Sequence, residues 1–157
     1  MEKTTEEQII DAINKSKLKE EESIDLIENL YWADWALLKE EYPDKIEEIF
    51  DYIKDENLTN IEISKVLKLY NNLDGAYIRE FSDIILKFYK RDKLRFIKSL
   101  SLESDETINL VYLFRDNDMK VDEDEELIDI SKSTSLSQAE SDTIETFMKM
   151  YKTVCST

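Results

Sequence analysis

The sequence predicts an all-α protein: a single domain of about seven helices arranged as antiparallel pairs, in a repeat array or an irregular bundle. Apolar residues recur at helical spacing along almost the whole chain. The 157 residues include one glycine and one proline, which is too few for a turn-rich β protein. A chain of this length buries enough surface to form a core without a metal or a disulfide, so we expect one domain over 1–157.

Capping motifs and the lone proline mark the starts of the N-terminal helices. Thr4 and Glu7 have the spacing of a capping box, in which each side chain accepts a hydrogen bond from the backbone N–H of the other residue. Thr59 and Glu62 repeat this spacing. Pro43 suits the first turn of a helix, where no N–H is needed. Together with the apolar periodicity, these residues predict helices over 5–16, 22–41, 43–54 and 59–70.

A break over 71–75, rich in Asn, Asp and Gly, separates these helices from the C-terminal ones. Asp92 is a suitable N-cap, and Ser135 and Gln138 have capping-box spacing. In the segment 104–115 the apolar residues point all round, so we expect a helix that is covered on most sides. The later helices are expected over 75–90, 92–101, 104–115 and 136–153.

The segment 116–134 interrupts the periodicity and carries eight acids in 19 residues. An EF-hand calcium loop needs glycine at its sixth position and glutamate at its twelfth. A loop beginning at Asp116 has Val121 and Leu127 there, and one beginning at Asp122 has Leu127 at the sixth position. We therefore expect a solvated acidic loop, and the sequence leaves open whether it binds divalent cations weakly. The acids are Asp116, Asp118, Asp122, Glu123, Asp124, Glu125, Glu126 and Asp129.

An internal similarity appears at an offset of 48 residues, where each copy is a long helix, a short break and a second helix. The aligned residues are Leu37, Leu38, Lys39, Asp44, Lys45, Ile46 and Ile49, which match Ile85, Leu86, Lys87, Asp92, Lys93, Leu94 and Ile97 in that order. Over roughly 22–115 this pattern resembles HEAT-like helical repeats, α-solenoid proteins whose period is about 40–47 residues. The resemblance implies a stack of helix pairs.

Composition excludes several classes of protein. The chain has 21 Lys and Arg against 37 Asp and Glu, and a net charge of −16 disfavours duplex nucleic acid and anionic membranes as partners. Without histidine and with one cysteine, Cys155, it lacks the residues of a His-based triad, a zinc site or a disulfide. One glycine, Gly75, cannot build a phosphate-binding loop. We expect no catalytic residue, no metal ligand and no cofactor.

A helical wheel of the segment 22–41 separates its two tryptophans. Trp35 falls on an apolar stripe with Tyr31, so we expect it to be buried. Trp32 falls past the edge of the apolar arc, near Lys39, and would stay in water unless a partner covers it. Because tryptophan is enriched at interface hot spots, we expect Trp32, Lys39 and Tyr31 to contact a partner. The alternative is that a neighbouring helix or loop covers Trp32.

Asp34 falls inside the apolar arc of the same wheel. A carboxylate buried there would either pair with a Lys or Arg side chain or hold its proton more tightly than usual, and in the second case it could act as a general acid. The alternative, which we favour, is a structural aspartate that is hydrogen-bonded or lines a groove.

A basic island interrupts the acidic sequence, with Asp92 as its one acid. Phe88, Tyr89 and Phe96 are interleaved with the cations, a spacing that is also found where proteins bind single-stranded nucleic acid. These aromatics lie at inward positions of the expected helices, so we favour ion pairing of the island with acidic neighbours. Its cations are Lys87, Lys90, Arg91, Lys93, Arg95 and Lys98.

These observations together favour a non-catalytic helical module that binds another protein or a peptide. The alternative is an acidic inhibitor or immunity-type protein that blocks a basic partner such as a nuclease. A carboxylate enzyme and a structural role are weaker alternatives. No apolar run is long enough to span a membrane, so we expect a soluble cytoplasmic protein, or else an exported one whose leader precedes this sequence. The oligomeric state is left open.

Overall fold

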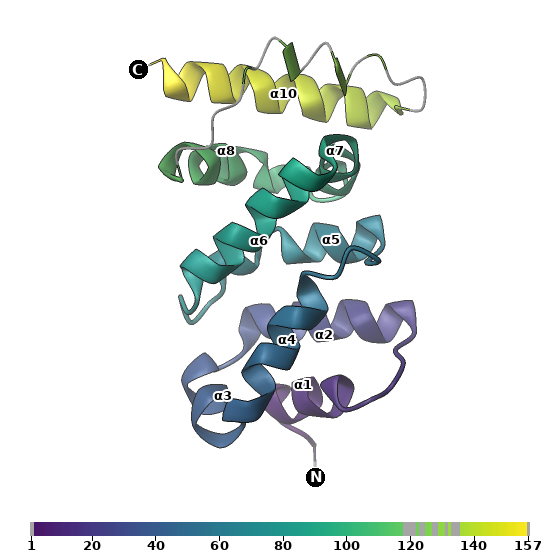
Figure 1. Cartoon of the computed structure of the whole chain (residues 1–157), viewed down its shortest axis with the longest axis vertical. Helices are drawn as coiled ribbons and strands as arrows, with labels where there is room; N and C mark the ends of the chain where they lie inside the picture. Colours follow the sequence, from purple (N-terminus) through teal and green to yellow (C-terminus); the bar gives the residue numbers. More distant parts are fainter. Residues whose placement is uncertain are drawn as a thin grey trace. The chain divides into compact units, whose positions relative to one another are not determined.

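Every regular element that the structure describes is helical, which confirms the all-α prediction (Figure 1). The computed structural model describes residues 2–117, 122, 125–126, 129–130, 132 and 136–156. The α-helices are α1 Thr5–Ile13, α2 Glu20–Trp32, α3 Trp35–Glu41, α4 Ile46–Ile53, α5 Asn60–Val66, α6 Ile78–Arg91, α7 Lys93–Ser101, α8 Thr107–Asp116 and α10 Gln138–Cys155. The 3₁₀-helices are η1 Pro43–Lys45, η2 Leu69–Asn71 and η3 Ser104–Glu106.

The chain divides into two compact units, Met1–Phe81 and Ser82–Thr157, and the boundary lies within α6. In the first unit α2 packs against both α1 and α5. In the second unit α10 packs against α8 and α7. In the part of the chain that the structure describes, none of the helices combines the length and the apolarity needed to cross a membrane.

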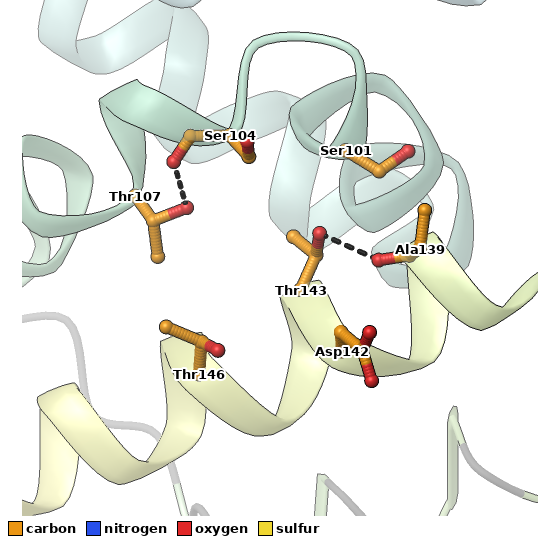
Figure 2. Close-up of a pocket in the computed structure, with 7 residues that line it drawn as sticks. All are labelled: Ser101, Ser104, Thr107, Ala139, Asp142, Thr143 and Thr146. Carbon is orange, nitrogen blue, oxygen red and sulfur yellow. Dashed lines mark hydrogen bonds between the residues drawn. The ribbon is translucent and has the colours of Figure 1, made fainter.

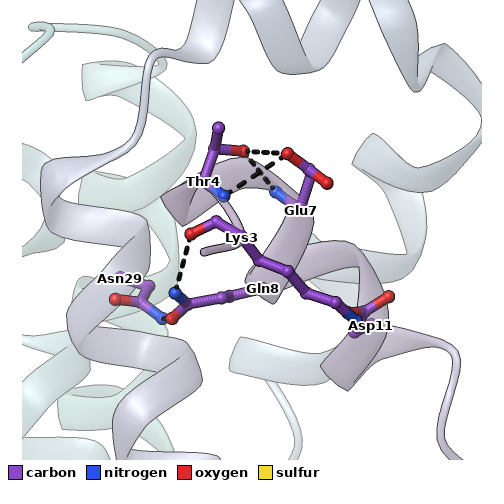
Figure 3. A network of polar contacts seen from close by, with 6 residues as sticks. All are labelled: Lys3, Thr4, Glu7, Gln8, Asp11 and Asn29. Carbon is purple, nitrogen blue, oxygen red and sulfur yellow. Dashed lines mark hydrogen bonds and ion pairs between the residues drawn. The ribbon is translucent and has the colours of Figure 1, made fainter. Parts of the chain in front are cut away.

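The predicted capping box starts α1 and helps to fix it on α2 (Figure 3). The Thr4 hydroxyl accepts a hydrogen bond from the N–H of Glu7 (3.1 Å), and the Glu7 carboxylate accepts one from the N–H of Thr4 (3.4 Å). The amide of Gln8 donates to the carbonyl of Lys3 (3.1 Å) and accepts from the amide of Asn29 on α2 (3.4 Å). These contacts satisfy donors that a helix start leaves without intrahelical partners.

The continuous helix predicted over 22–41 is wrong, because the chain breaks at Ala33 and Asp34. Both residues are extended, and the Asp34 carboxylate caps α3 by accepting from the N–H of Leu37 (3.0 Å). The orphan carbonyls at the end of α2 find partners nearby. The Leu30 carbonyl accepts from the indole N–H of Trp35 (3.1 Å), and the Tyr31 carbonyl accepts from the N–H of Leu73 (3.0 Å).

An aromatic cluster forms the core of the first unit. Trp35 is 1% exposed, and its ring packs on Phe50, Tyr77 and Phe81 with centroids 6.2, 5.4 and 5.6 Å away. Such aromatic pairs contribute about 0.5–1.5 kcal/mol each beyond the burial of their area. Trp35, the first residue of α3 after the break, therefore lies within this core.

A second aromatic cluster, Tyr89, Phe96, Phe114 and Phe147, forms the core of the second unit. It joins the end of α6 to α7, α8 and α10. The prediction that the segment 104–115 is covered on most sides is wrong. Ile108 and Tyr112 are exposed, since α8 buries one face against α10 and leaves the other in water.

The N-cap of the last helix differs from the sequence prediction, and most of the predicted acidic loop lies outside the described residues. The last helix is capped by Ser137 with Glu140 in a capping box, not by Ser135, which lies outside the described residues. Most of the predicted acidic loop over 116–134 also lies outside them. Of its described acids, Asp116 ends α8, and Glu125, Glu126 and Asp129 have helical backbone.

Candidate interaction surface

Two large apolar side chains of the first unit are left in water close to each other. Trp32, at the end of α2, is 61% exposed, and Leu73, in the loop after η2, is 68% exposed. The predicted contrast between an exposed Trp32 and a buried Trp35 is therefore confirmed. Trp32 and Leu73 line a hollow of about 200 Å³ together with Ala33, Asp34 and Asp74, and we name it the Trp32 hollow.

The backbone around the Trp32 hollow is fixed by hydrogen bonds from both sides. The N–H of Leu73 donates to the carbonyl of Tyr31, the last but one residue of α2 (3.0 Å). The N–H of Trp35 donates to the Asp74 carboxylate (3.1 Å). The loop that carries Leu73 and Asp74 is thus bonded directly to the break between α2 and α3. These bonds fix the positions of the two segments that line the hollow.

Asn72 organises the loop from inside. Its buried side-chain amide donates to the carbonyls of Leu69 (3.0 Å) and Ala76 (2.7 Å), and its side-chain oxygen accepts from the N–H of Ala76 (3.1 Å). Gly75 has a φ of +69°, in the left-handed region that glycine adopts at little cost. The loop is therefore a defined turn, and the exposure of Leu73 does not come from a lack of local structure.

Carboxylates surround the apolar part of the hollow. Asp34 is exposed, so the prediction of a buried carboxylate at this position is wrong: the helix break moves it from the apolar arc to the N-cap of α3. Glu6 of α1 accepts from the N–H of Asp34 (3.1 Å). Among the described residues, no ion pair within 4.0 Å involves Glu6, Asp34 or Asp74. The hollow therefore combines apolar walls with a negative rim.

Of the three predicted partner residues, Trp32 and Lys39 line two different hollows that share Asp74, and Tyr31 lies beside Trp32. The rings of Tyr31 and Trp32 meet edge to face, with centroids 5.1 Å apart, and the Lys68 ammonium lies 5.7 Å from the Tyr31 centroid. Lys39 is exposed but lines a second, adjoining hollow of about 260 Å³. That hollow is lined by Trp35, Ala36, Lys39, Asp74, Ala76 and Tyr77.

A carboxylate that the sequence did not single out as buried is Glu62, on α5. One of its oxygens accepts from the N–H of Thr59 in the predicted capping box (3.0 Å), and the other accepts from the Ser23 hydroxyl. Since a hydroxyl has one proton, the Tyr52 hydroxyl donates to Ser23. Burial raises the pKa of Tyr52, and the negative charge of Glu62 raises it further. This network joins α2, α4 and α5 and is structural.

The basic island lies on α6 and α7, and its aromatics point inward as expected: Phe88, Tyr89 and Phe96 are all buried. Lys93 pairs with Glu126, which agrees with the predicted ion pairing to acidic neighbours. The Arg91 guanidinium stacks over the Phe88 ring at 5.2 Å from its centroid. The aromatics that are interleaved with the cations are therefore not exposed for stacking on bases.

A third hollow lies in the second unit and is lined by small side chains (Figure 2). Its volume is about 390 Å³, and small side chains from α7, η3, α8 and α10 line it: Ser101, Ser104, Thr107, Ala139, Asp142, Thr143 and Thr146. The hydroxyl protons of Ser101, Thr107 and Thr143 are used within their own helical turns, on backbone carbonyls. This hollow offers hydrogen-bond acceptors but no apolar anchor for a partner.

Within the described residues, no three acidic or cysteine side chains come together in a group that could hold a metal ion. The chain matches no protein-family model, no curated protein and no solved structure.

Proposed function

We propose that this protein is a non-catalytic module that binds a segment of another protein at the Trp32 hollow. The observation that carries the proposal is the pairing of exposed Trp32 with exposed Leu73 on backbone that is already fixed. Exposed apolar groups on a rigid frame lose little conformational entropy on binding, and tryptophan is the residue most enriched at binding hot spots. Contact with a partner would remove the cost of leaving these side chains in water.

The resemblance to HEAT-like repeats is a part of this proposal. The first aligned segment covers α3, η1 and α4, and the second covers α6 and α7. An array of helix pairs would present grooves to extended partner segments, as solenoid proteins do. Binding at the Trp32 hollow does not depend on this architecture.

The inhibitor alternative is favoured by one specific observation, the negative rim of Glu6, Asp34 and Asp74. A basic partner would be steered toward such a rim, and its association rate would fall steeply with ionic strength. A partner segment anchored on Trp32 and Leu73 would keep most of its affinity at high salt, because apolar contacts are not screened, even with one cation beside the rim. The affinity that remains at high salt separates the two candidates.

The test of the proposal begins with a benzophenone side chain introduced at position 73, which would crosslink the partner for identification. The purified partner is then titrated with the wild-type protein and with Trp32→Ala. We expect Trp32→Ala to weaken binding by about 1–3 kcal/mol. The control is Leu102→Ala, which removes an exposed leucine from the second unit and should bind like the wild type. Equal affinity of Trp32→Ala and the wild type would reject the proposal.

A further inference from the structure

The Trp32 hollow shows which kind of side chain it would take. Its apolar surface is the Trp32 indole and the Leu73 side chain, and its base includes the buried Ala33. Its polar groups are the carboxylates of Asp34 and Asp74. A purely apolar side chain would leave these two charges desolvated and unpaired, which is costly. A cationic side chain has an apolar stem and a charged head. Its stem would contact Trp32 and Leu73, and its head would pair with the carboxylates.

Each of the two carboxylates is held in place by a hydrogen bond to one of its oxygens, and its other oxygen accepts none from the part of the chain that the structure describes. Asp34 accepts from the N–H of Leu37 through Oδ1 (3.0 Å), and Asp74 accepts from the N–H of Trp35 through Oδ2 (3.1 Å). Among the described residues, no hydrogen bond reaches Oδ2 of Asp34 or Oδ1 of Asp74. Each carboxylate therefore has a fixed position and an oxygen available for a donor from outside.

We propose that the Trp32 hollow binds an arginine side chain of the partner, next to an apolar residue that covers Leu73. This inference rests on the proposed function, because it names the chemistry of the segment that fills the hollow. A planar guanidinium can stack on the indole face while its N–H groups bond to carboxylates. Lysine offers a point charge without the planar fork, so arginine is the better fit. The net charge of −16 favours the approach of a basic segment.

The experiment follows the indole N–H resonance of Trp32 by NMR during titration with blocked dipeptides. The probes are acetyl-Leu-Arg-amide, acetyl-Leu-Lys-amide and acetyl-Leu-Gln-amide. We expect the Arg probe to shift the Trp32 resonance and to bind about fivefold more tightly than the Gln probe, since two exposed ion pairs contribute about two- to threefold each. The Lys probe should fall between them.

Two variants test the carboxylates without disturbing the backbone they hold. Asp34→Asn and Asp74→Asn each keep a side-chain oxygen that accepts from the same N–H, and asparagine is as good an N-cap as aspartate. The double variant should lose about fivefold in affinity for the Arg probe and change little for the Gln probe. The matched control is Asp44→Asn, an exposed acid on η1 outside the hollow, which should bind the Arg probe as the wild type does.

Three results would overturn the inference. The Arg and Gln probes could bind equally well, the double variant could bind the Arg probe like the wild type, or no probe could shift the Trp32 resonance at millimolar concentration. None of these results touches the proposed function, which fails only if Trp32→Ala leaves the affinity for the whole partner unchanged. The two failures are thus distinguishable.

Discussion

The N–H of Leu73 donates a hydrogen bond to the carbonyl of Tyr31 at 3.0 Å, across 42 residues of sequence. This bond satisfies a carbonyl at the end of α2, where the helix itself supplies no partner. It also fixes the backbone of Leu73 next to Trp32. The same contact that terminates a helix therefore places two exposed apolar side chains together, and it links the stability of the fold to the shape of the hollow.

We predict that the two tryptophans contribute very differently to stability. Trp35→Ala should lower the free energy of unfolding by about 3–5 kcal/mol, because it empties the centre of the aromatic cluster. Trp32→Ala should change it by less than about 0.5 kcal/mol, because its side chain is mostly in water. Urea unfolding of both variants is the measurement. A large loss for Trp32→Ala would mean that this side chain supports the fold.

We predict that Asn72 is the residue on which the loop depends. Asn72→Ala removes three side-chain hydrogen bonds and leaves the Ala76 N–H and C=O without these partners. The expected loss is about 1–3 kcal/mol of unfolding free energy. Amide hydrogen exchange at Leu73 should also quicken, because its bond to Tyr31 depends on the same turn. Asn57→Ala, an exposed asparagine in another loop of the first unit, is the control and should have little effect.

The sequence was most informative where structure depends on near neighbours. The capping boxes of Thr4 with Glu7 and of Thr59 with Glu62, and the N-cap at Asp92, are all present. Each involves residues three apart, so spacing alone identifies it. The break at Asp34 was missed, although aspartate is a common N-cap, because the apolar periodicity continues across it. Apolar periodicity indicates which residues are buried. It marks Trp35 as buried whether or not the helix is interrupted before it.

The candidate site could be predicted only in part. The exposure of Trp32 follows from its place on the helix surface. The position of Leu73 beside it depends on a backbone contact between distant segments, and no local pattern carries that information. The Glu62 network could not be predicted for the same reason, since its members Ser23 and Tyr52 lie on two other helices. Asp34 is hydrogen-bonded and lines a hollow, as the favoured interpretation of the sequence has it, but it is exposed and not a buried carboxylate.

We predict that the Glu62 carboxylate stabilises the fold through its two hydrogen-bonded oxygens. Glu62→Ala should lower the free energy of unfolding by about 2–3 kcal/mol, because the Ser23 hydroxyl is buried and would lose its acceptor. Glu62→Gln keeps the shape and an acceptor oxygen, so its loss should be smaller. Thermal unfolding of both variants provides the comparison. Equal losses would show that the one acceptor oxygen kept by glutamine gives no stabilisation, which would contradict a role for the separate hydrogen bonds.

We predict that Tyr89 makes the protein sensitive to alkali. Burial raises the pKa of Tyr89 far above its usual value of about 10, and the negative charge of Glu126 adds to the shift. Above about pH 10 the unfolded chain loses this proton while the folded chain keeps it. The contribution of Tyr89 to the free energy of unfolding is therefore fully present below that pH. It falls as pH rises, by up to about 1.4 kcal/mol per pH unit for this one group. Denaturant unfolding between pH 8 and pH 11, roughly the span of tyrosine titration, measures the slope.

Tyr89→Phe tests this assignment, because it keeps the buried ring and removes the proton. Its stability should fall less steeply above about pH 10 than that of the wild type. Tyr52, whose pKa is also raised by burial, supplies part of the remaining slope. A variant with an unchanged slope would show that other groups cause the alkaline sensitivity.

We predict that Asp34 acts on stability through its hydrogen bond to the N–H of Leu37 and not through its charge. Asp34→Ala should lower the free energy of unfolding by about 1 kcal/mol, the usual effect of losing an N-cap. Asp34→Asn keeps the accepting oxygen and should change it by no more than a few tenths of a kcal/mol. Urea unfolding of the two variants at the same ionic strength decides between these roles. Equal destabilisation would mean that the negative charge at the start of α3 is needed, and the cap would then not be the cause.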